Sequence, residues 1–152
     1  MIRRSTIPLR LHEQFRITLQ DGILTVLCPP DTCFERQEIQ WQLQTILVNV
    51  LRSEAKRLLP ERLAGLAERY GFVYKGVKVN SARTRWGSCS GKKMINLSCF
   101  LLLLPEHLID YVLLHELCHT REMNHGTDFW KLLNKATNGT AHQLRYELRS
   151  NV

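Results

Sequence analysis

The chain has 152 residues, of which 44% are hydrophobic and 23% charged, a length and composition typical of one soluble globular domain. Its five cysteines are odd in number and include no CxxC pair, which argues against a disulfide framework or a cysteine-type zinc finger and favours a reducing, cytoplasmic location. The longest apolar run is far shorter than the ~20 residues that cross a bilayer, so no membrane association is expected. The net charge of +7 favours anionic partners without identifying them.

The N-terminal part of the chain is predicted to form a hairpin followed by helical segments. Two β-rich stretches, FRITLQ and ILTVLCP, flank Asp21-Gly22, a dipeptide typical of two-residue hairpin turns. A long helix is expected from about Cys33 to Leu59, and Pro60 is expected to break or kink it. A second helical stretch, ERLAGLAERY, ends at Gly71, which suits the left-handed residue that commonly follows a helix.

The middle of the chain has the alternating pattern of strands. The expected strands lie within FVYKGVKVN (72–80), ARTRWGSCS (82–90) and MINLS (94–98). The last two are predicted to form a hairpin across residues 91–93, where Gly91 favours a turn.

The C-terminal part is predicted to be helical. Pro105 occupies the favoured first position of a helix that runs to His119 and carries apolar residues on more than one side, so this helix should be central and buried. Further helices are expected near residues 128–136 and 141–149. The expected organisation is one α+β domain over residues 1–152, with a hairpin and long helix in 1–71 and a catalytic core in 72–152.

The predicted central helix carries an H-E-x-x-H motif at residues 115–119. Positions i and i+4 of a helix differ by ~40° around its axis and ~6 Å along it, so His115 and His119 can reach one ion. Zinc accepts neutral imidazole nitrogens and suits three protein ligands plus a water. Glu116 is placed to take the proton from that water as general base.

His125 is the predicted third ligand. In a continued helix it would lie ~15 Å from His115, so it can bind the same ion only if the chain turns back after His119. Asn124 tolerates a left-handed conformation and Gly126 follows it, which would permit that turn. The spacing H-E-x-x-H-x5-H equals that of metzincins, but Glu122 replaces their turn glycine and no later methionine supplies a Met-turn, so metzincin membership is rejected.

Four segments together resemble a known family. They are RTRWGSCS (83–90), INLS (95–98), LPEHLIDYVLLHELCH (104–119) and NHGTDFW (124–130). They resemble the YgjP-like metal-dependent hydrolases, also called YgjP-like metallopeptidases, which are related to SprT-like and other zincin peptidases. The resemblance is dense over residues 72–137 and loose before them. It implies a minimal zincin-like fold, in which a small mixed sheet packs against helices around the motif helix. It also implies that His115, His119 and His125 are metal ligands and that Glu116 is catalytic.

Two further features bear on the substrate. Arg83 and Arg85 are expected to alternate along a strand and face one side, where they could bind a substrate carboxylate or phosphate, although surface arginines that stack on neighbours are the plainer interpretation. The strand with RWGSC could also receive an extended peptide by strand addition, with Gly87 permitting close backbone approach or marking a bulge.

Three functions remain open on the sequence alone. A metallopeptidase or amidase is favoured by the motif. A metal-dependent nucleotide phosphoanhydride hydrolase, of the nucleoside triphosphate pyrophosphatase type, is favoured by the net charge and the two arginines, but no GxxxxGK[ST] loop is present. A nucleic-acid-associated SprT-like protease lacks any recognisable nucleic-acid module. The expected cofactor is Zn²⁺, although other divalent ions fit such ligands, and the sequence does not give the oligomeric state.

Overall fold

A computed structural model describes residues 16–20 and 23–151, which form two compact units, one up to Val50 and one from Leu51 onward. The first unit contains strands β1 (Arg16–Gln20) and β2 (Ile23–Leu27), which pair antiparallel. The predicted hairpin strands are thereby confirmed, whereas Asp21 and Gly22 lie outside the described residues and their turn stays a prediction. The organisation as one domain also stays a prediction.

Helix α1 (Gln37–Tyr70) differs from the prediction in both its start and its continuity. It begins four residues after Cys33, because Thr32 closes a turn in which its N–H and its hydroxyl both donate to the carbonyl of Pro29. It also runs unbroken through Pro60, so the predicted break is wrong. Leu59 and Leu63, on either side of the proline, are almost completely buried, and this packing holds the helix where local preference alone would end it.

Gly71 ends α1 as predicted, with φ of +74°. The N–H of Phe72 donates to the carbonyl of Ala67 at 2.8 Å, a bond that spans the left-handed residue and closes the helix end. Phe72 is therefore used to cap the helix, and the first strand of the next sheet begins only at Gly76.

The second unit is built on a three-stranded sheet of β3 (Gly76–Asn80), β4 (Gly87–Cys89) and β5 (Met94–Ser98) in the order β3-β5-β4. Strand β3 pairs parallel with β5, and β4 pairs antiparallel with it, so the sheet is mixed, as expected, and the predicted hairpin across residues 91–93 is confirmed. Strand β4 stands at one edge of the sheet.

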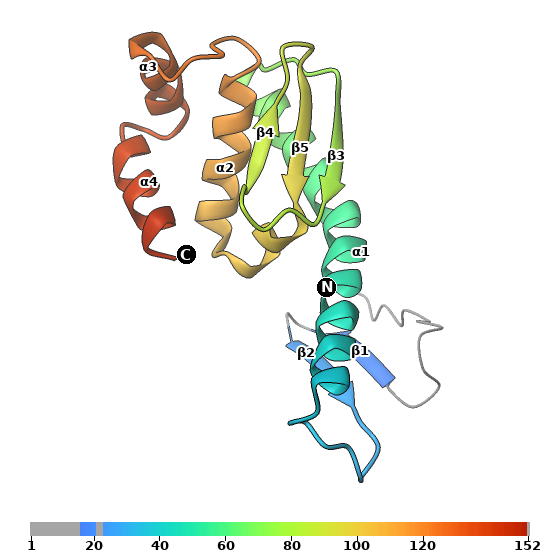
Figure 1. Cartoon of the computed structure of the whole chain (residues 1–152). Helices are drawn as coiled ribbons and strands as arrows, with labels where there is room; N and C mark the ends of the chain where they lie inside the picture. The colour runs from blue at the N-terminus through green and yellow to red at the C-terminus, as the bar shows by residue number, and fades with distance from the viewer. Residues whose placement is uncertain (1–15, 21–22, 152) are drawn as a thin grey trace. The chain divides into compact units, whose positions relative to one another are not determined.

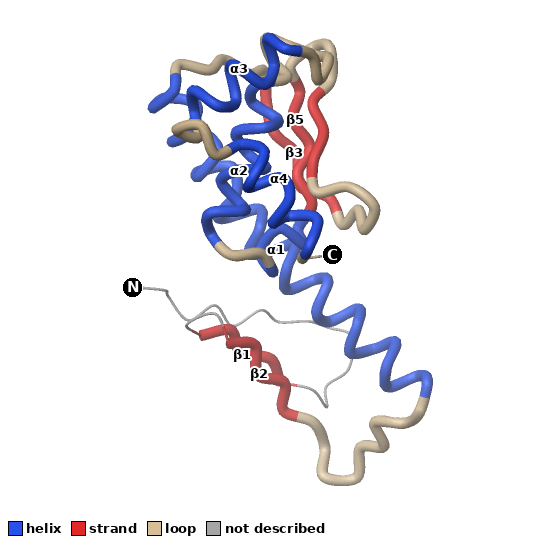
Figure 2. The backbone as a smooth tube through the Cα atoms, turned by 90° about the vertical axis from the view of Figure 1, so that its left-hand side faces the viewer, coloured by secondary structure: helices blue, strands red, loops and turns tan. Residues whose placement is uncertain are grey.

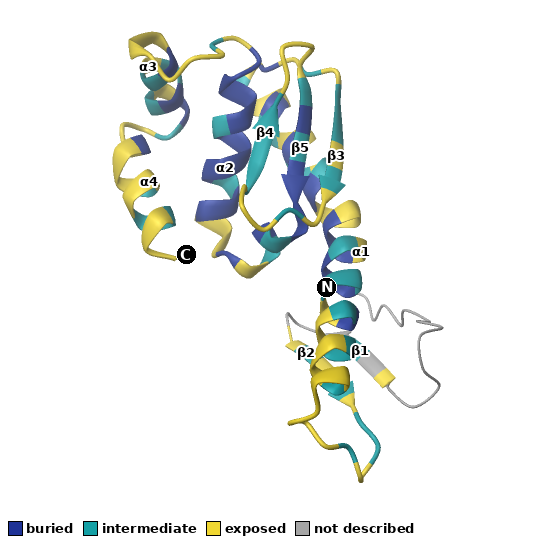
Figure 3. Ribbon diagram, in the orientation of Figure 1, coloured by how far each residue is buried: buried dark blue, intermediate teal, exposed yellow. Residues whose placement is uncertain are grey.

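Four helical segments complete this unit: η1 (Cys99–Leu103), α2 (Glu106–Cys118), α3 (Thr127–Ala136) and α4 (Ala141–Ser150). Figure 1 shows α2 beside β4, and Figure 2 shows the helices of this unit gathered on one side of the sheet. Buried residues are most numerous on α2, and they also line one side of α1 and occupy three positions of β5 (Figure 3). Nine of the thirteen residues of α2 are buried, which confirms that this helix is central.

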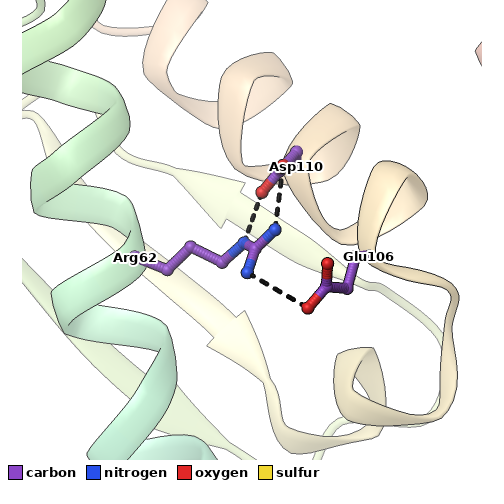
Figure 4. Close-up of polar contacts among 3 residues, drawn as sticks. All are labelled: Arg62, Glu106 and Asp110. Carbon is purple, nitrogen blue, oxygen red and sulfur yellow. Dashed lines mark hydrogen bonds and ion pairs between the residues drawn. The ribbon is translucent and has the colours of Figure 1, made fainter.

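Hydrogen bonds and ion pairs connect side chains on the exposed face of α2 to the neighbouring helices α1 and α4. Arg62 on α1 donates to both carboxylate oxygens of Asp110, at 2.5 and 3.0 Å, and lies 3.8 Å from Glu106 (Figure 4). His107 pairs with Glu147 on α4 at 2.6 Å.

Among the described helices, none is both long enough and apolar enough to span a membrane. The cytoplasmic location stays a prediction.

Candidate metal centre

The H-E-x-x-H motif lies at the C-terminal end of α2, where the predicted i, i+4 geometry is realised. The Nε2 atoms of His115 and His119 are 3.2 Å apart, and their ring centroids are 4.9 Å apart. His115 lies in the last turn of α2 and His119 caps its C-terminal end. Most residues of this helix are buried, so the core fixes the backbone that carries the two side chains.

His125 is brought back to the same point by a turn that follows α2. The helix ends at Cys118, and the N–H groups of Thr120 and Glu122 donate to the carbonyls of Leu117 and Cys118, which tightens the chain beyond the helix end. The Nε2 of His125 lies 3.1 Å from that of His115. The return predicted from the sequence is thus confirmed.

The backbone conformation predicted for this turn is wrong. Neither Asn124 nor Gly126 has a positive φ in the described structure, and Gly126 instead precedes the first turn of α3 in an extended conformation. The turn is made by short-range bonds of the helix end, so it needs no left-handed residue, and the position of the metzincin glycine is open to a residue such as Glu122.

Glu122 contributes through its backbone. The Nδ1 of His119 lies 3.0 Å from the carbonyl oxygen of Glu122 and donates its hydrogen to it. That bond fixes the tautomer of His119, because a neutral imidazole with hydrogen on Nδ1 presents an unprotonated Nε2. The free lone pair therefore points at the other two imidazoles.

All three imidazoles contact one aromatic side chain. Phe129, on the first turn of α3, is fully buried, and its ring centroid lies 4.9 Å from that of His115, 4.6 Å from that of His119 and 4.8 Å from that of His125. Phe129 is therefore a core residue as well as a neighbour of the triad. No residue spacing in the sequence predicts that Phe129 contacts all three histidines.

The three nitrogen atoms fit a divalent metal ion. The candidate ligand atoms all lie within 4.8 Å of one another, and two of the distances are 3.1 and 3.2 Å. Nitrogen ligands about 2.0–2.1 Å from a tetrahedral zinc ion are separated by about 3.3 Å. Without an ion, the single hydrogen of His115 Nε2 would have to serve two neighbouring nitrogens, whereas one cation satisfies all three lone pairs.

The surroundings keep the ligands neutral, as metal binding requires. Burial, followed by the charges of the other two imidazoles and of Arg145, lowers the pKa of His115 to about 3. Burial also lowers the pKa of His119, against the raising effect of its backbone hydrogen bonds.

Glu116 is buried beside the triad, with only 6% of its surface exposed. Burial raises its pKa to about 7, and the positive charge of Arg85 acts in the opposite direction. Strand β4 covers the carboxyl group through Gly87, where a β-carbon would lie 3.0 Å from Cγ of Glu116. The absence of a side chain at position 87 therefore makes room for the carboxyl group itself, rather than for a bulge in the strand.

A cavity of about 270 Å³ opens at His115 and Glu116. It lies against the start of β4, the middle of α2 and one side of α4, and its lining includes Arg85, Arg145 and Arg149. Sequence reasoning missed the two arginines of α4, because nothing in the pattern of residues 141–150 places that helix against α2.

Arg83 and Arg85 do not alternate along a strand, so that expectation is wrong. Residues 81–86 form the connection between β3 and β4, which begins where the side chain of Asn80 accepts the N–H of Ala82 and Ser98 Oγ donates to the Ala82 carbonyl. The guanidinium of Arg83 lies over the ring of Phe100, at 5.6 Å, whereas Arg85 lines the cavity at Glu116. Both arginines line a second cavity of about 310 Å³.

Two further potential ligands, both on α4, have other partners. Glu147 pairs with His107, and His142 stacks on Trp130 with the ring centroids 4.3 Å apart. Within the described residues, the metal-ligand cluster contains three histidines and no fourth protein group. Three protein ligands with an open position are typical of a catalytic rather than a structural site.

The fold and the histidine triad together define a small metallopeptidase-type domain. The chain matches the YgjP-like metallopeptidase domain over residues 2–151, nearly its whole length, and belongs to that family. The resemblance seen in the sequence is thereby confirmed, and so is the expectation of a metal-binding enzyme. No curated protein matches the chain.

Two solved structures share the fold. One is the metallopeptidase zymogen abylysin of Pyrococcus abyssi, with 23% identity and a TM-score of 0.53 over 59% of this chain and 90% of that one. The other is the metallopeptidase zymogen jannalysin of Methanocaldococcus jannaschii, with 20% identity and a TM-score of 0.50 over 59% of this chain and 91% of that one. The expected minimal α+β peptidase fold is therefore confirmed.

Proposed function

We propose that the chain hydrolyses peptide bonds with a zinc ion held by His115, His119 and His125 and with Glu116 as general base. The observation that carries the proposal is the convergence of three imidazole Nε2 atoms beside a buried carboxyl group, within a family of metallopeptidases. When bound, a zinc ion supplies a Lewis acid that polarises the substrate carbonyl and acidifies a water molecule.

Glu116 would accept the proton of the attacking water and pass it to the leaving amine. Its raised pKa suits both transfers, since a group that titrates near neutral pH can hold and release a proton under working conditions. Gly87 and β4 close one side of the carboxyl group and exclude bulk water from it, which leaves the cavity side open to the substrate.

The edge of the sheet offers a place for the peptide backbone. The carbonyl of Trp86 accepts a hydrogen bond from the N–H of Ser98, and the N–H of Ser90 donates to the carbonyl of Met94. Because backbone groups alternate in direction along an antiparallel pair, the N–H and C=O groups of Gly87 and Cys89 point away from β5. An extended peptide that pairs with them would add a strand beside β4 and pass in front of Glu116.

The nucleotide alternative has one observation in its favour, which is the presence of three arginines around the cavity. The described structure supplies no glycine-rich phosphate loop, and family membership favours peptides. We therefore rank nucleotide phosphoanhydride hydrolysis second. No feature of the described residues favours nucleic-acid binding.

The Glu116→Gln variant tests the proposal. The zinc-loaded protein and the variant are incubated with a peptide mixture, and the cleaved bonds are identified by mass spectrometry. The variant should bind one zinc ion per chain but lose about 10³-fold in cleavage rate, as expected for removal of a general base. A mixture of nucleoside triphosphates is treated in parallel. The proposal would be contradicted if the Glu116→Gln variant still cleaved peptides at the wild-type rate. It would also be contradicted if the only activity lost in the variant were hydrolysis of nucleoside triphosphates.

The matched control is Glu106→Gln, a second glutamate on the same helix. Its carboxylate is exposed and lies near Arg62, on the outer side of α2. This variant should keep both the zinc content and the cleavage rate. A similar loss in both variants would point to contamination or to a general effect on α2.

A further inference from the structure

Three guanidinium groups surround the cavity beside the metal centre. Arg85 comes from the connection before β4, whereas Arg145 and Arg149 come from α4, about sixty residues later in the chain. Their charges reach the site, because Arg85 acts on Glu116, Arg145 acts on His115, and both arginines of α4 act on Tyr111. Two separate elements therefore bring positive charge to the lining of one cavity beside His115 and Glu116.

None of these three arginines has an ion-pair partner among the described residues. Other arginines of the same unit do have partners: Arg57 pairs with Glu54, and Arg62 with Asp110. Arg145 and Arg149 are spaced i, i+4, so they lie on one helix face as like charges, an arrangement that destabilises a helix by itself. Among the described residues that line the cavity, Glu116 alone carries a carboxyl group, and that group is assigned to proton transfer.

Arg145 is also held in place. Its guanidinium lies 5.3 Å from the ring centroid of Trp130, within the range of a cation–π contact, and Trp130 in turn stacks on His142. A guanidinium that is already oriented loses less conformational entropy when it binds an anion.

The cavity is small. Its volume of about 270 Å³ falls below the ~300–1,000 Å³ typical of sites for drug-sized ligands. Its lining also contains apolar and aromatic groups, among them the buried Val112 and the half-buried Trp86 and Leu148. The three arginines of the lining are exposed. A small cavity that combines apolar groups with exposed arginines matches a short acidic side chain or a chain terminus, and arginine binds a carboxylate through two parallel hydrogen bonds.

We propose that this cavity is a specificity subsite that binds a carboxylate of the peptide substrate through Arg85, Arg145 and Arg149. The inference rests on the proposed peptidase function and names its substrate class. The carboxylate belongs either to an acidic residue next to the cleaved bond or to the C-terminus of the peptide. The subsite then places that bond at His115 and Glu116.

The experiment profiles cleavage by the zinc-loaded full chain on a proteome-derived peptide library, offered with free and with amidated C-termini. Acidic residues should be enriched at least fivefold at one position beside the cleaved bond, or amidation should reduce cleavage at least tenfold. The first result assigns an acidic side chain and the second a terminal carboxylate. In Arg145→Gln and in Arg149→Gln, whichever preference is found should fall below twofold.

The matched control is Arg69→Gln. Arg69 is an exposed arginine whose guanidinium also lies 5.3 Å from an aromatic ring centroid, that of Tyr70, but it does not line the cavity. This variant removes the same charge and should retain the full preference. The inference is overturned if the wild-type protein cleaves without either preference, or if the α4 variants keep it.

A binding arm separates this inference from the proposed function. Calorimetry measures the affinity of the zinc-loaded Glu116→Gln protein for pentapeptides of alanine in which the central residue is Glu or Gln. Each peptide is offered with a free and with an amidated C-terminus. The carboxylate-bearing peptide should bind about tenfold more weakly once Arg145 or Arg149 is replaced, whether or not any peptide is cleaved. Equal affinities, or an arginine-dependent affinity for a nucleoside triphosphate alone, would overturn the carboxylate subsite.

Discussion

Gly87 on β4 lies so close to Glu116 on α2 that a β-carbon at position 87 would be 3.0 Å from Cγ of Glu116 and 3.3 Å from its Oε1. The same β-carbon would be 3.1 Å from the carbonyl oxygen of Asn96 on β5, which cannot move without disturbing the sheet. Any side chain at this position must therefore displace the carboxyl group of Glu116.

The Gly87→Ala variant should therefore lose activity while keeping its metal ion. A displacement of the carboxyl group by a few tenths of an ångström or more would lower kcat/KM by about 10–100-fold, since misplaced catalytic groups have effects of this size. The strain should also reduce the free energy of unfolding by about 1–2 kcal/mol. Zinc content measured by atomic absorption and peptide cleavage rates together check both expectations.

Gly91→Ala is the control for this substitution. Gly91 lies in the turn between β4 and β5, has no positive φ, and nothing lies within 4 Å of a β-carbon added there. Its alanine variant should match the wild-type protein in activity. Equal activities of the two alanine variants would show that Glu116 tolerates the added methyl group.

The proximity of the three histidines could be predicted from the sequence because it depends on local geometry. His115 and His119 are one helical turn apart, and the apolar composition of residues 105–118 predicts that their helix is buried. His125 required a chain reversal, which was predicted correctly although its backbone conformation was not. Several short-range bonds at a helix end can produce such a reversal without a signature residue.

Contacts between distant segments could not be predicted in this way. Phe129 beneath the triad and Arg145 at the cavity depend on how α3 and α4 pack against α2, and neither position has a spacing that signals it. Pro60 shows the opposite case, in which a clear local signal is overruled by the buried leucines around it.

Phe129→Leu should weaken zinc binding by about tenfold, because the loss of groups that orient metal ligands commonly costs 10–100-fold in affinity. Leucine keeps the site apolar but removes the ring on which His119 stacks and which His115 and His125 contact in T-shaped geometry. Competition with a fluorescent zinc chelator measures the change.

The control for Phe129→Leu is Leu133→Val, one turn further along α3 and also fully buried. That variant should lower the unfolding midpoint without changing zinc affinity. An unchanged affinity in Phe129→Leu would mean that the hydrogen bond from His119 to Glu122 and the backbone are sufficient to orient the ligands.

The pair of Arg62 and Asp110 should show a measurable coupling energy. The contact is bidentate and both side chains are about one-third exposed, so solvent screening limits its contribution to about 1 kcal/mol. A double-mutant cycle with Arg62→Ala and Asp110→Ala, followed by urea unfolding, measures it. The coupling should fall in 1 M NaCl, and a coupling near zero at low salt would assign the contact no role in joining α1 to α2.

Pro60→Ala should stabilise the second unit. Proline has no N–H, so the carbonyl of Lys56 lacks its usual partner one turn later, and a proline inside a helix costs about 3 kcal/mol relative to alanine. Proline also restricts the unfolded chain, which offsets about 0.4–1 kcal/mol of that cost. A net gain of about 2 kcal/mol in the free energy of unfolding is therefore expected from urea titration, whereas Glu61→Ala, at the exposed neighbouring position, should change it by less than about 0.5 kcal/mol. A loss of stability in Pro60→Ala would instead mean that the proline shapes α1 for the packing of Leu59 and Leu63 against the core.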